Sequence, residues 1–348
     1  MRKYFLIFTI ASMAFSCLEN SNSNNDEIFA GQMPNLVKDS KGNVHLVYGS
    51  GDSIFYNYSL DNGRSFSPPI LVGILPKLAA SHMRGPQIAA GSNGVIITAC
   101  NNIGNIFSYS KDQSGNWSEP VRVNDIDSIA KENLMALSAN SNNAFAVWLD
   151  LRDGHNRIYG AKSTDGGKSW SKNILVYASP DTTVCECCKP SVIVNGNNVF
   201  VMFRNWLNGN RDLYLVQSKD GGNIFGQAQK LGTGSWPLNG CPMDGGGLAI
   251  NDKDIPETVW NRKGVIYACE LGKEEKKLGE GRNCTIELVN GKNVYAWVED
   301  GNVVVLKPQG IKSKLGKGQL PVLKGVDKEH VLCIWENDKK IHKAIIEI

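Results

Sequence analysis

Short runs of alternating apolar and polar residues recur along almost the whole chain. Such alternation is typical of half-buried β-strands, and no apolar pattern of helical period and helical length is present. A strand-like segment precedes each run and another follows it, across turns that contain glycine or asparagine. The clearest runs are residues 44–48, 95–99, 144–148, 199–203, 256–260, 294–298 and 331–335. The pattern predicts an all-β chain built from repeated units.

One motif recurs within these units. It reads Ser-x-Asp-x-Gly-x-x-Trp/Phe at residues 59–66, 163–170 and 218–225, and residues 110–117 are a looser copy with one extra residue. The copies lie about 50 residues apart, a period that fits one four-stranded blade of a β-propeller. The aspartate can accept hydrogen bonds from turn amides, and the glycine can adopt a positive φ. We therefore expect these aspartates to pin hairpins and not to act in catalysis.

The motif resembles the Asp-box of sialidases, and the chain is identified as a member of the sialidase-like (BNR/Asp-box repeat) β-propeller superfamily. Seven units fit the sequence, so seven blades are favoured, and the six blades of typical sialidase domains are the alternative. Residues 27–30 would supply the last strand of the final blade and close the ring, which removes an exposed sheet edge. The units start near Pro34, Pro86, Leu134, Pro190, Gly246, Cys284 and Leu320.

The N-terminus resembles a bacterial lipoprotein signal. Two basic residues precede an apolar stretch at residues 4–14, which is too short to span a bilayer as a helix. Small residues then lead to Cys17, the expected site of lipidation. We expect residues 1–16 to be a signal peptide, residues 17–27 a lipidated tether and residues 28–348 the propeller. The alternative is ordinary secretion with cleavage nearby. Lipidation would anchor the protein to a membrane of the bacterial cell envelope, facing the periplasm or the cell surface.

Composition excludes several classes of function. The chain has 37 Lys and Arg against 34 Asp and Glu, a formal charge of +3, which is not the balance of a strongly basic nucleic-acid binder. There is no phosphate-binding glycine loop and no His-Glu-x-x-His segment. We expect no cofactor, no nucleic-acid partner and a monomer.

Antiparallel strand order predicts which charged side chains share a face. The starts of the first strands and the ends of the second strands lie on one face of a propeller, and the Asp-boxes lie on the other. Guanidinium groups bind carboxylates through paired hydrogen bonds, and a carboxyl group with a raised pKa can act as a general acid. A site for an anionic sugar is therefore expected there, and ordinary solvated ion pairs are the alternative. The candidates are Arg84, Arg152, Arg204, Arg262, Asp150, Asp244 and Glu299.

The sialidase resemblance implies roles for some of these residues. The segment Arg84-Gly85-Pro86 looks like the Arg-x-Pro segment of sialidases, whose arginine holds the substrate carboxylate, although Gly85 replaces the usual isoleucine. By this resemblance Arg204 and Arg262 would join Arg84, Asp150 or Asp244 would be the acid, and Glu299 would be a supporting carboxylate. No tyrosine nucleophile is evident, since neither Tyr48 nor Tyr295 has a motif around it.

Cysteines form a second group near the same face. The segments Cys185-Glu186-Cys187-Cys188 and Cys241-Pro242-Met243-Asp244-Gly245 are similar to segments of uncharacterised bacterial sialidase-like propellers. We expect Cys241 to form a disulfide with one of the other three cysteines, and the remaining two to be a possible second pair. The alternative is a soft-metal site that also uses Met83, Met243 or His82. Four further cysteines are expected to be core thiols or strand-level pairs: Cys100, Cys269, Cys284 and Cys333.

Three functions remain open from the sequence. The first is a glycoside hydrolase of sialidase type that acts on acidic glycans with the arginines and carboxylates named above. The second is a non-catalytic propeller that binds a glycan or a protein at the cell surface, which the missing tyrosine favours. The third is a metal-binding propeller.

Overall fold

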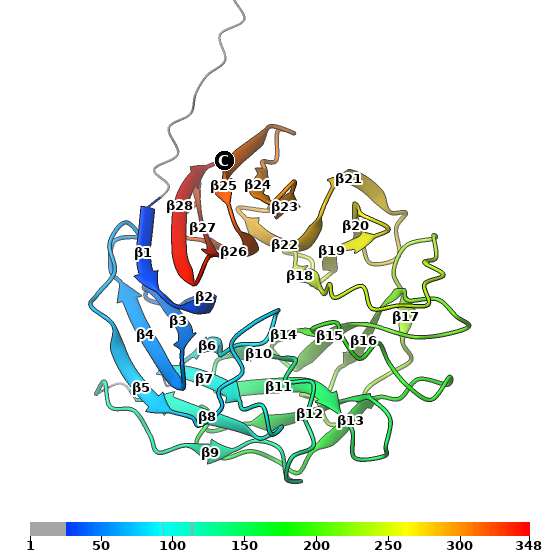
Figure 1. The fold of residues 1–348 in the computed structure, drawn as a ribbon, viewed down its shortest axis with the longest axis horizontal. Coiled ribbons are helices and arrows are strands. Elements are labelled where there is room, and N and C mark those ends of the chain that lie inside the picture. The colour runs from blue at the N-terminus through cyan, green and yellow to red at the C-terminus, as the bar shows by residue number, and fades with distance from the viewer. Residues whose placement is uncertain (1–25, 93, 113) are drawn as a thin grey trace, which may run out of the picture.

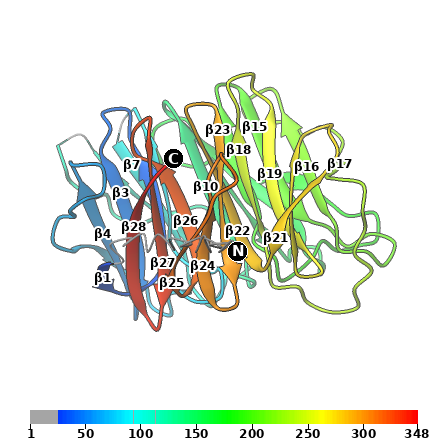
Figure 2. The same cartoon turned by 90° about the horizontal axis from the view of Figure 1, so that it is seen from above.

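The computed structural model describes residues 26–92, 94–112 and 114–348. Every regular element among these residues is a β-strand, and the strands form seven separate four-stranded antiparallel sheets. Figure 1 shows the sheets arranged as blades around a common axis, and Figure 2 shows the same ring turned on its side. The structure thus confirms the all-β, seven-bladed propeller.

The first three blades follow one another in the chain, and in each the first strand is innermost. They consist of β2 (Gln32–Lys38), β3 (Val44–Ser50), β4 (Ser53–Ser59) and β5 (Ile70–Ile74); β6 (Gln87–Gly91), β7 (Gly94–Cys100), β8 (Ile106–Lys111) and β9 (Val121–Arg122); and β10 (Met135–Asn140), β11 (Asn143–Asp150), β12 (Arg157–Ser163) and β13 (Ile174–Tyr177).

Three further blades continue the ring in the same way. They consist of β14 (Ser191–Asn195), β15 (Asn198–Arg204), β16 (Leu213–Ser218) and β17 (Gln229–Lys230); β18 (Gly246–Ile250), β19 (Pro256–Arg262), β20 (Val265–Glu270) and β21 (Lys276–Glu280); and β22 (Arg282–Val289), β23 (Lys292–Glu299), β24 (Asn302–Leu306) and β25 (Lys312–Lys317).

The seventh blade joins the two ends of the described chain. Its inner strands are β26 (Gln319–Gly325), β27 (His330–Asn337) and β28 (Lys340–Glu347), and its outermost strand is β1 (Asp26–Ala30). In Figure 1 the blue β1 lies beside the red β28, and the two strands pair in antiparallel fashion. This pairing confirms the predicted closure of the ring.

Tryptophans bury the contact between successive blades. Trp148, Trp260, Trp297 and Trp335 occupy the second strands of four blades, and each is at most 2% exposed. Trp148, for example, packs with Cys100 of the preceding blade. Truncating such a residue to alanine typically costs about 3–5 kcal/mol. The core of the protein therefore lies between the blades, away from the axis.

The Asp-box turns hold hairpins together, as predicted. In the second tight copy Ser163 Oγ donates to Asp165 Oδ1 at 2.8 Å, and the same oxygen of Asp165 accepts from the Ser169 amide at 3.0 Å. The Gly167 amide donates to Ser163 Oγ at 2.9 Å, and Gly167 has a φ of +83°. A Cβ at Gly167 would meet the side chain of Ile96 in the preceding blade at 2.8 Å. The box therefore stabilises its own turn and also packs against the preceding blade.

Several predictions concern the N-terminus. The signal peptide and the lipidation site Cys17 lie outside the described residues, and β1 begins at Asp26, slightly before the predicted start of the propeller. No helix long and apolar enough to cross a bilayer occurs in residues 26–92, 94–112 and 114–348.

Candidate functional site

A channel of about 660 Å³ runs along the axis of the ring. All seven inner strands contribute to its wall, from β2 to β26. The start of each inner strand faces one end of the channel, and the Asp-box turns lie toward the other end. We call the first end the channel mouth and define it by five polar residues of the wall: Asn35, Gln87, Lys189, Asp244 and Asn283.

Gln87 connects three blades at the channel mouth. Its Oε1 accepts hydrogen bonds from Asn35 Nδ2 at 2.8 Å and from Lys189 Nζ at 2.7 Å. Its own Nε2 donates to the carbonyl of Gly85 at 2.9 Å. Burial lowers the pKa of Lys189 to about 8. The mouth thus presents amide groups and a cationic nitrogen in fixed positions.

Asp244 and Arg204 meet on the other side of the mouth, and both are 2% exposed. Asp244 Oδ2 accepts the Asn283 amide at 2.9 Å, while its Oδ1 has no hydrogen-bond partner. Burial raises the pKa of Asp244 to about 6, against the opposing effects of the Asn283 amide and the Arg204 charge. This carboxyl group can therefore hold a proton under mildly acidic conditions.

Arg204 is directed at main-chain carbonyls. Nη1 donates to Arg211 O at 2.8 Å, Nη2 donates to Asn261 O at 3.0 Å, and Nε lies 3.4 Å from Asp244 O. Because Asn261 belongs to the next blade, Arg204 joins two blades. Its donors are already engaged, so the side chain has a structural role in this arrangement.

Arg84 directly follows Met83 of the channel wall and is the least tightly paired of the four predicted arginines. Its Nε donates to Glu132 O at 2.7 Å and its Nη1 to His82 O at 3.1 Å. The nearest carboxylate oxygen, on Glu132, is 3.9 Å from Nη2. The side chain of Arg84 remains 22% exposed, so its outer nitrogens can still reach a ligand.

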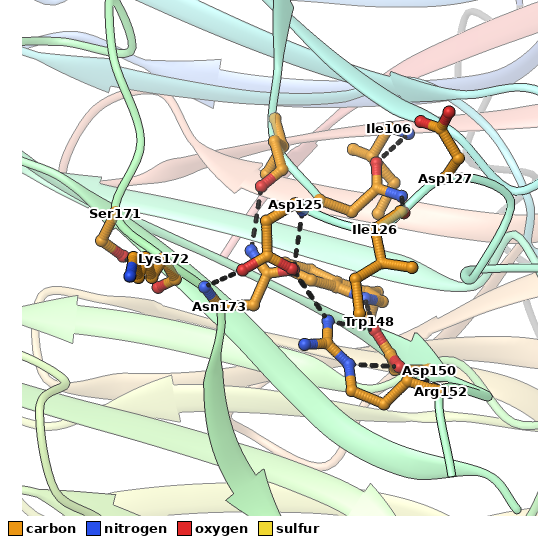
Figure 3. Close-up of polar contacts among 12 residues, drawn as sticks. Ile106, Asp125, Ile126, Asp127, Trp148, Asp150, Arg152, Ser171, Lys172 and Asn173 are labelled. Carbon is orange, nitrogen blue, oxygen red and sulfur yellow. Dashed lines mark hydrogen bonds and ion pairs between the residues drawn. The ribbon is translucent and has the colours of Figure 1, made fainter. Parts of the chain in front are cut away.

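Arg152 and Asp150 belong to a network near the outer strands, shown in Figure 3. Arg152 Nε donates to Asp150 Oδ1 at 2.9 Å, and Nη2 donates to Asn173 Oδ1 at 2.8 Å and lies 3.3 Å from Asp125 Oδ1. Trp148 Nε1 donates to Asp150 Oδ2 at 2.8 Å. Asp125 follows the outer strand β9, and Asn173 precedes the outer strand β13. This pair therefore does not line the channel.

Arg262 and Glu299 occupy equivalent places in later blades. Arg262 forms a two-point ion pair with Glu275, next to the outer strand β21, and its guanidinium lies 4.1 Å from the ring centre of Tyr267. Glu299 accepts two hydrogen bonds from Lys312 of the outer strand β25, each 2.7 Å long. The expectation that all the predicted charges gather at the axis is thus wrong for these two residues and for Asp150 and Arg152. Their roles in binding or catalysis stay predictions.

The reason for this separation is visible in the sequence. Asp150, Arg262 and Glu299 each lie two residues after a buried tryptophan of the second strand. In a strand, residues two apart point to the same face. The side chain therefore follows the tryptophan into the space between blades, and its charge is balanced there by a partner near the outer strands.

The cysteine-rich turn before β14 lies close to the channel mouth. Cys187 and Cys241 form a disulfide, which confirms that Cys241 pairs with one of the three neighbouring cysteines. Cys185 and Cys188 remain thiols, with their sulfur atoms 3.5 Å apart. The hydrogen bond between Cys185 and Cys188, aided by the charges of Arg211 and Arg204, lowers the pKa of Cys185 to about 7, whereas burial raises the pKa of Cys188.

The other described cysteines are separate and buried, as predicted for core thiols. They lie in strands of four different blades: Cys100, Cys269, Cys284 and Cys333.

Neither candidate tyrosine is placed as a nucleophile at the mouth. Tyr48 is 2% exposed, its ring stacks against Phe29 and Phe55, and burial raises its pKa to about 12. Tyr295 lies within β23, and burial raises its pKa to about 12 as well. Neither residue lines the channel.

Sequence reasoning missed Gln87 and Asn35 as residues of the mouth. Both are polar residues of inner strands, and Gln87 directly follows the Arg84-Gly85-Pro86 segment. An uncharged polar residue at the start of an innermost strand is the signal that would have identified Gln87, whereas Asn35 lies in the middle of β2.

The fold and its repeated turns define an Asp-box β-propeller with a polar channel mouth. A family model described as a BNR repeat-like domain matches residues 18–235, and the chain belongs to this family. No curated protein matches the sequence significantly.

Solved structures of similar fold include a lectin, a sialidase and an arabinanase. The lectin from Burkholderia pseudomallei is 9% identical with a TM-score of 0.66, covering 92% of this chain and 97% of that one. The Hadza microbial sialidase Hz136 is 14% identical with a TM-score of 0.53, covering 92% and 66%. The α-L-arabinanase from Penicillium chrysogenum is 11% identical with a TM-score of 0.52, covering 93% and 97%. At these identities the likeness concerns the fold.

Proposed function

We propose that the protein is an exported propeller that binds an acidic saccharide at its channel mouth without hydrolysing it. The proposal rests on the arrangement of Gln87, Lys189 and Arg84. The Gln87 amide and the Lys189 ammonium belong to the channel wall, and the partly exposed guanidinium of Arg84 lies three residues before Gln87 in the chain. Sugar hydroxyls both donate and accept hydrogen bonds, and a sugar carboxylate pairs with cationic donors, so this set suits an acidic saccharide.

The other predicted arginines support binding over sialidase-type hydrolysis. Arg204 is engaged by main-chain carbonyls and Arg262 by Glu275, so three arginines do not meet around one carboxylate. No tyrosine of the described chain lines the channel. The words lectin, sialidase and arabinanase describe the proteins of similar fold, and here they only guide the choice of ligands to test.

Calorimetric titration with a panel of uronic-acid and sialic-acid oligosaccharides tests the proposal. We expect saturable binding with no released sugar in the same samples. Lys189→Met is expected to weaken binding about 10-fold, because it removes a charge-assisted contact. Lys277→Met is the matched control, since Lys277 is an exposed lysine of the outer strand β21. Absence of binding across the panel, or equal loss in both variants, would contradict the proposal.

One observation favours hydrolysis as a second candidate. Asp244 belongs to the channel wall, its buried Oδ1 has no hydrogen-bond partner, and burial raises its pKa to about 6, which suits a general acid. A hydrolase would release sugar from glycoside reporters between about pH 5 and 7, and Asp244→Asn would abolish that release. Turnover of this kind would replace the binding proposal with the enzymatic one.

We also propose that Cys17 carries the lipid that holds the protein in the bacterial cell envelope. The proposal rests on the signal-like segment before Cys17, described above. Mass spectrometry of the N-terminal peptide is expected to show acyl chains on Cys17, and Cys17→Ala is expected to release the protein from membranes. An unmodified Cys17 in the membrane fraction would contradict this.

A further inference from the structure

Three sulfur atoms converge in the turn that leads into β14. Cys185 Sγ lies 3.7 Å from Cys187 Sγ and 3.5 Å from Cys188 Sγ, and all three sulfurs lie within 4.8 Å of one another. The three residues are at most 7% exposed and pack together. The Cys187–Cys241 disulfide uses only one of these three sulfurs, so the two thiols beside it call for a further explanation.

The contrast with the remaining described cysteines shows that burial alone does not produce this grouping. Cys100 and Cys333, for example, are also buried, but each lies alone in a strand of its own blade. The clustered thiols instead lie on an irregular segment. Packing within a β-strand therefore does not explain why cysteine occurs at these positions.

The turn is held firmly by the blades around it. The Cys185 amide donates to Arg204 O at 3.1 Å, and the Val184 amide donates to Asn156 O at 2.9 Å. The disulfide from Cys187 ties the same turn to the segment before β18. The sulfurs are therefore preorganised by contacts with two neighbouring blades.

A buried cation faces the cluster. Arg211 Nη1 lies 3.0 Å from Cys185 Sγ, and Arg211 is 6% exposed. Glu186, whose side chain is 44% exposed, pairs with the same guanidinium at 3.2 Å. Thiolates bound to a monovalent metal ion keep a net negative charge, and Arg211 is placed to balance that charge.

We propose that this turn binds one Cu(I) ion through the thiolates of Cys185 and Cys188, with Cys187 as a third ligand when its disulfide is open. Thiolates are soft ligands that favour Cu(I), Zn²⁺ and iron–sulfur clusters. Structural Zn²⁺ takes four ligands at about 2.3 Å, which places ligand sulfurs about 3.8 Å apart. The observed separations are of this size, but with the disulfide closed only Cys185 and Cys188 are free thiols, and the group holds no histidine or carboxylate. Cu(I), which is stable with two or three thiolates, therefore fits this set better.

The chemistry of loading is simple. Cys185 and Cys188 each lose a proton to solvent as a copper–sulfur bond forms. Opening of the Cys187–Cys241 disulfide needs a dithiol reductant, which becomes a disulfide while both cysteines become thiols. Cys187 then loses its proton to the third copper–sulfur bond. Copper binding at this turn is a different activity from saccharide binding and goes beyond the proposed function.

The test titrates the full chain anaerobically with Cu(I) in the presence of a chromogenic Cu(I) chelator. We expect one Cu(I) per chain, before and after treatment with a dithiol, with tighter retention afterwards. Cys185→Ala and Cys188→Ala are expected to release the metal to the chelator. Cys100→Ala is the matched control, because Cys100 is a buried thiol in another blade, and it should retain the ion.

Two further variants keep the test decisive if an alanine variant does not fold. Cys241→Ala leaves Cys187 without its disulfide partner and should bind Cu(I) tightly without any reductant. Arg211→Gln keeps all the sulfurs and should weaken Cu(I) binding about 10-fold, the usual size of an outer-sphere effect. X-ray absorption should show sulfur alone around the copper.

Three results would overturn the proposal. They are failure of the wild-type chain to retain Cu(I), equal retention by a folded double variant lacking Cys185 and Cys188, and retention of Zn²⁺ in preference to Cu(I).

Discussion

The two faces of the propeller are built by different means. The Asp-box face repeats one short turn, in which Ser163, Asp165 and Gly167 satisfy one another within a few residues. The channel mouth has no repeated unit. Gln87 there contacts residues more than 50 and 100 positions away in the chain. Local repetition supplies the frame, and single-copy contacts between blades supply the chemistry.

This difference separates changes that act on stability from changes that act on function. The serine and the last glycine of each tight box are buried, and that glycine packs against a neighbouring blade, so their loss should weaken the ring. A residue of the mouth is held from several blades and still faces the channel, so its loss should alter what the channel binds. The following predictions test this division, from the largest expected effect to the smallest.

The disulfide is the strongest long-range restraint at the mouth. Cys187 and Cys241 are 54 residues apart in the sequence, and closing a loop of this size typically contributes about 3–4 kcal/mol. Cys241→Ala is therefore expected to lower the free energy of unfolding in urea by about that amount. Reductant should remove the difference between the variant and wild type. Equal stability of the two oxidised proteins would show that the mouth does not depend on this link.

Two adjacent glycines distinguish the two roles of the Asp-box, which are to form its own turn and to pack against the preceding blade. Gly221 and Gly222 both have positive φ, but a Cβ at Gly222 would lie 2.5 Å from Phe145 of the preceding blade, whereas a Cβ at Gly221 would meet nothing within 4 Å. Gly222→Ala should cost about 3 kcal/mol and Gly221→Ala about 1 kcal/mol, as measured by urea unfolding. Equal losses would mean that the box does not support its neighbour.

Asp244 gives the mouth a pH dependence. Burial raises its pKa from 3.8 to about 6, so the folded protein holds this proton more tightly than the unfolded chain. Wild-type stability should therefore fall, relative to Asp244→Asn, as the pH rises from about 4 to 7, by up to about 3 kcal/mol. Unfolding curves of both proteins across this range measure the difference. A difference that does not change with pH would contradict the burial of this carboxyl group.

The smallest effects are expected from substitutions of two arginines, Arg84 and Arg262. Arg84→Gln should weaken binding of an acidic saccharide about 10-fold, because Arg84 is partly exposed and directly follows Met83 of the channel wall. Arg262→Gln should act on stability instead, since Arg262 is paired with Glu275 near an outer strand. Calorimetry and urea unfolding on both variants separate these effects. Loss of affinity in Arg262→Gln would place the ligand among the outer arginines.

The sequence allowed the fold to be predicted in detail, because its signals are local. The alternating runs, the box motif and the spare segment at residues 27–30 each depend on nearby residues, and they gave the strands, the turns and the ring closure. For the Cys241 disulfide, the sequence predicted that the partner is one of three cysteines.

The position of the charged side chains was harder to predict. Topology correctly placed Asp150, Arg262 and Glu299 near the same ends of their strands, but it could not show their radial direction. That direction is set by the tryptophan two residues earlier and by partners such as Glu275 and Lys312. Gln87 escaped notice because its contacts join three blades, and no short sequence pattern encodes them.

A crystal structure of the protein with its tightest-binding acidic saccharide is the most direct test of the central claim, that the channel mouth is the binding site. The saccharide is expected to contact Gln87, Lys189 and Arg84 at the start of the inner strands. A saccharide bound instead beside Arg152 or Arg262, near the outer strands, would contradict the account.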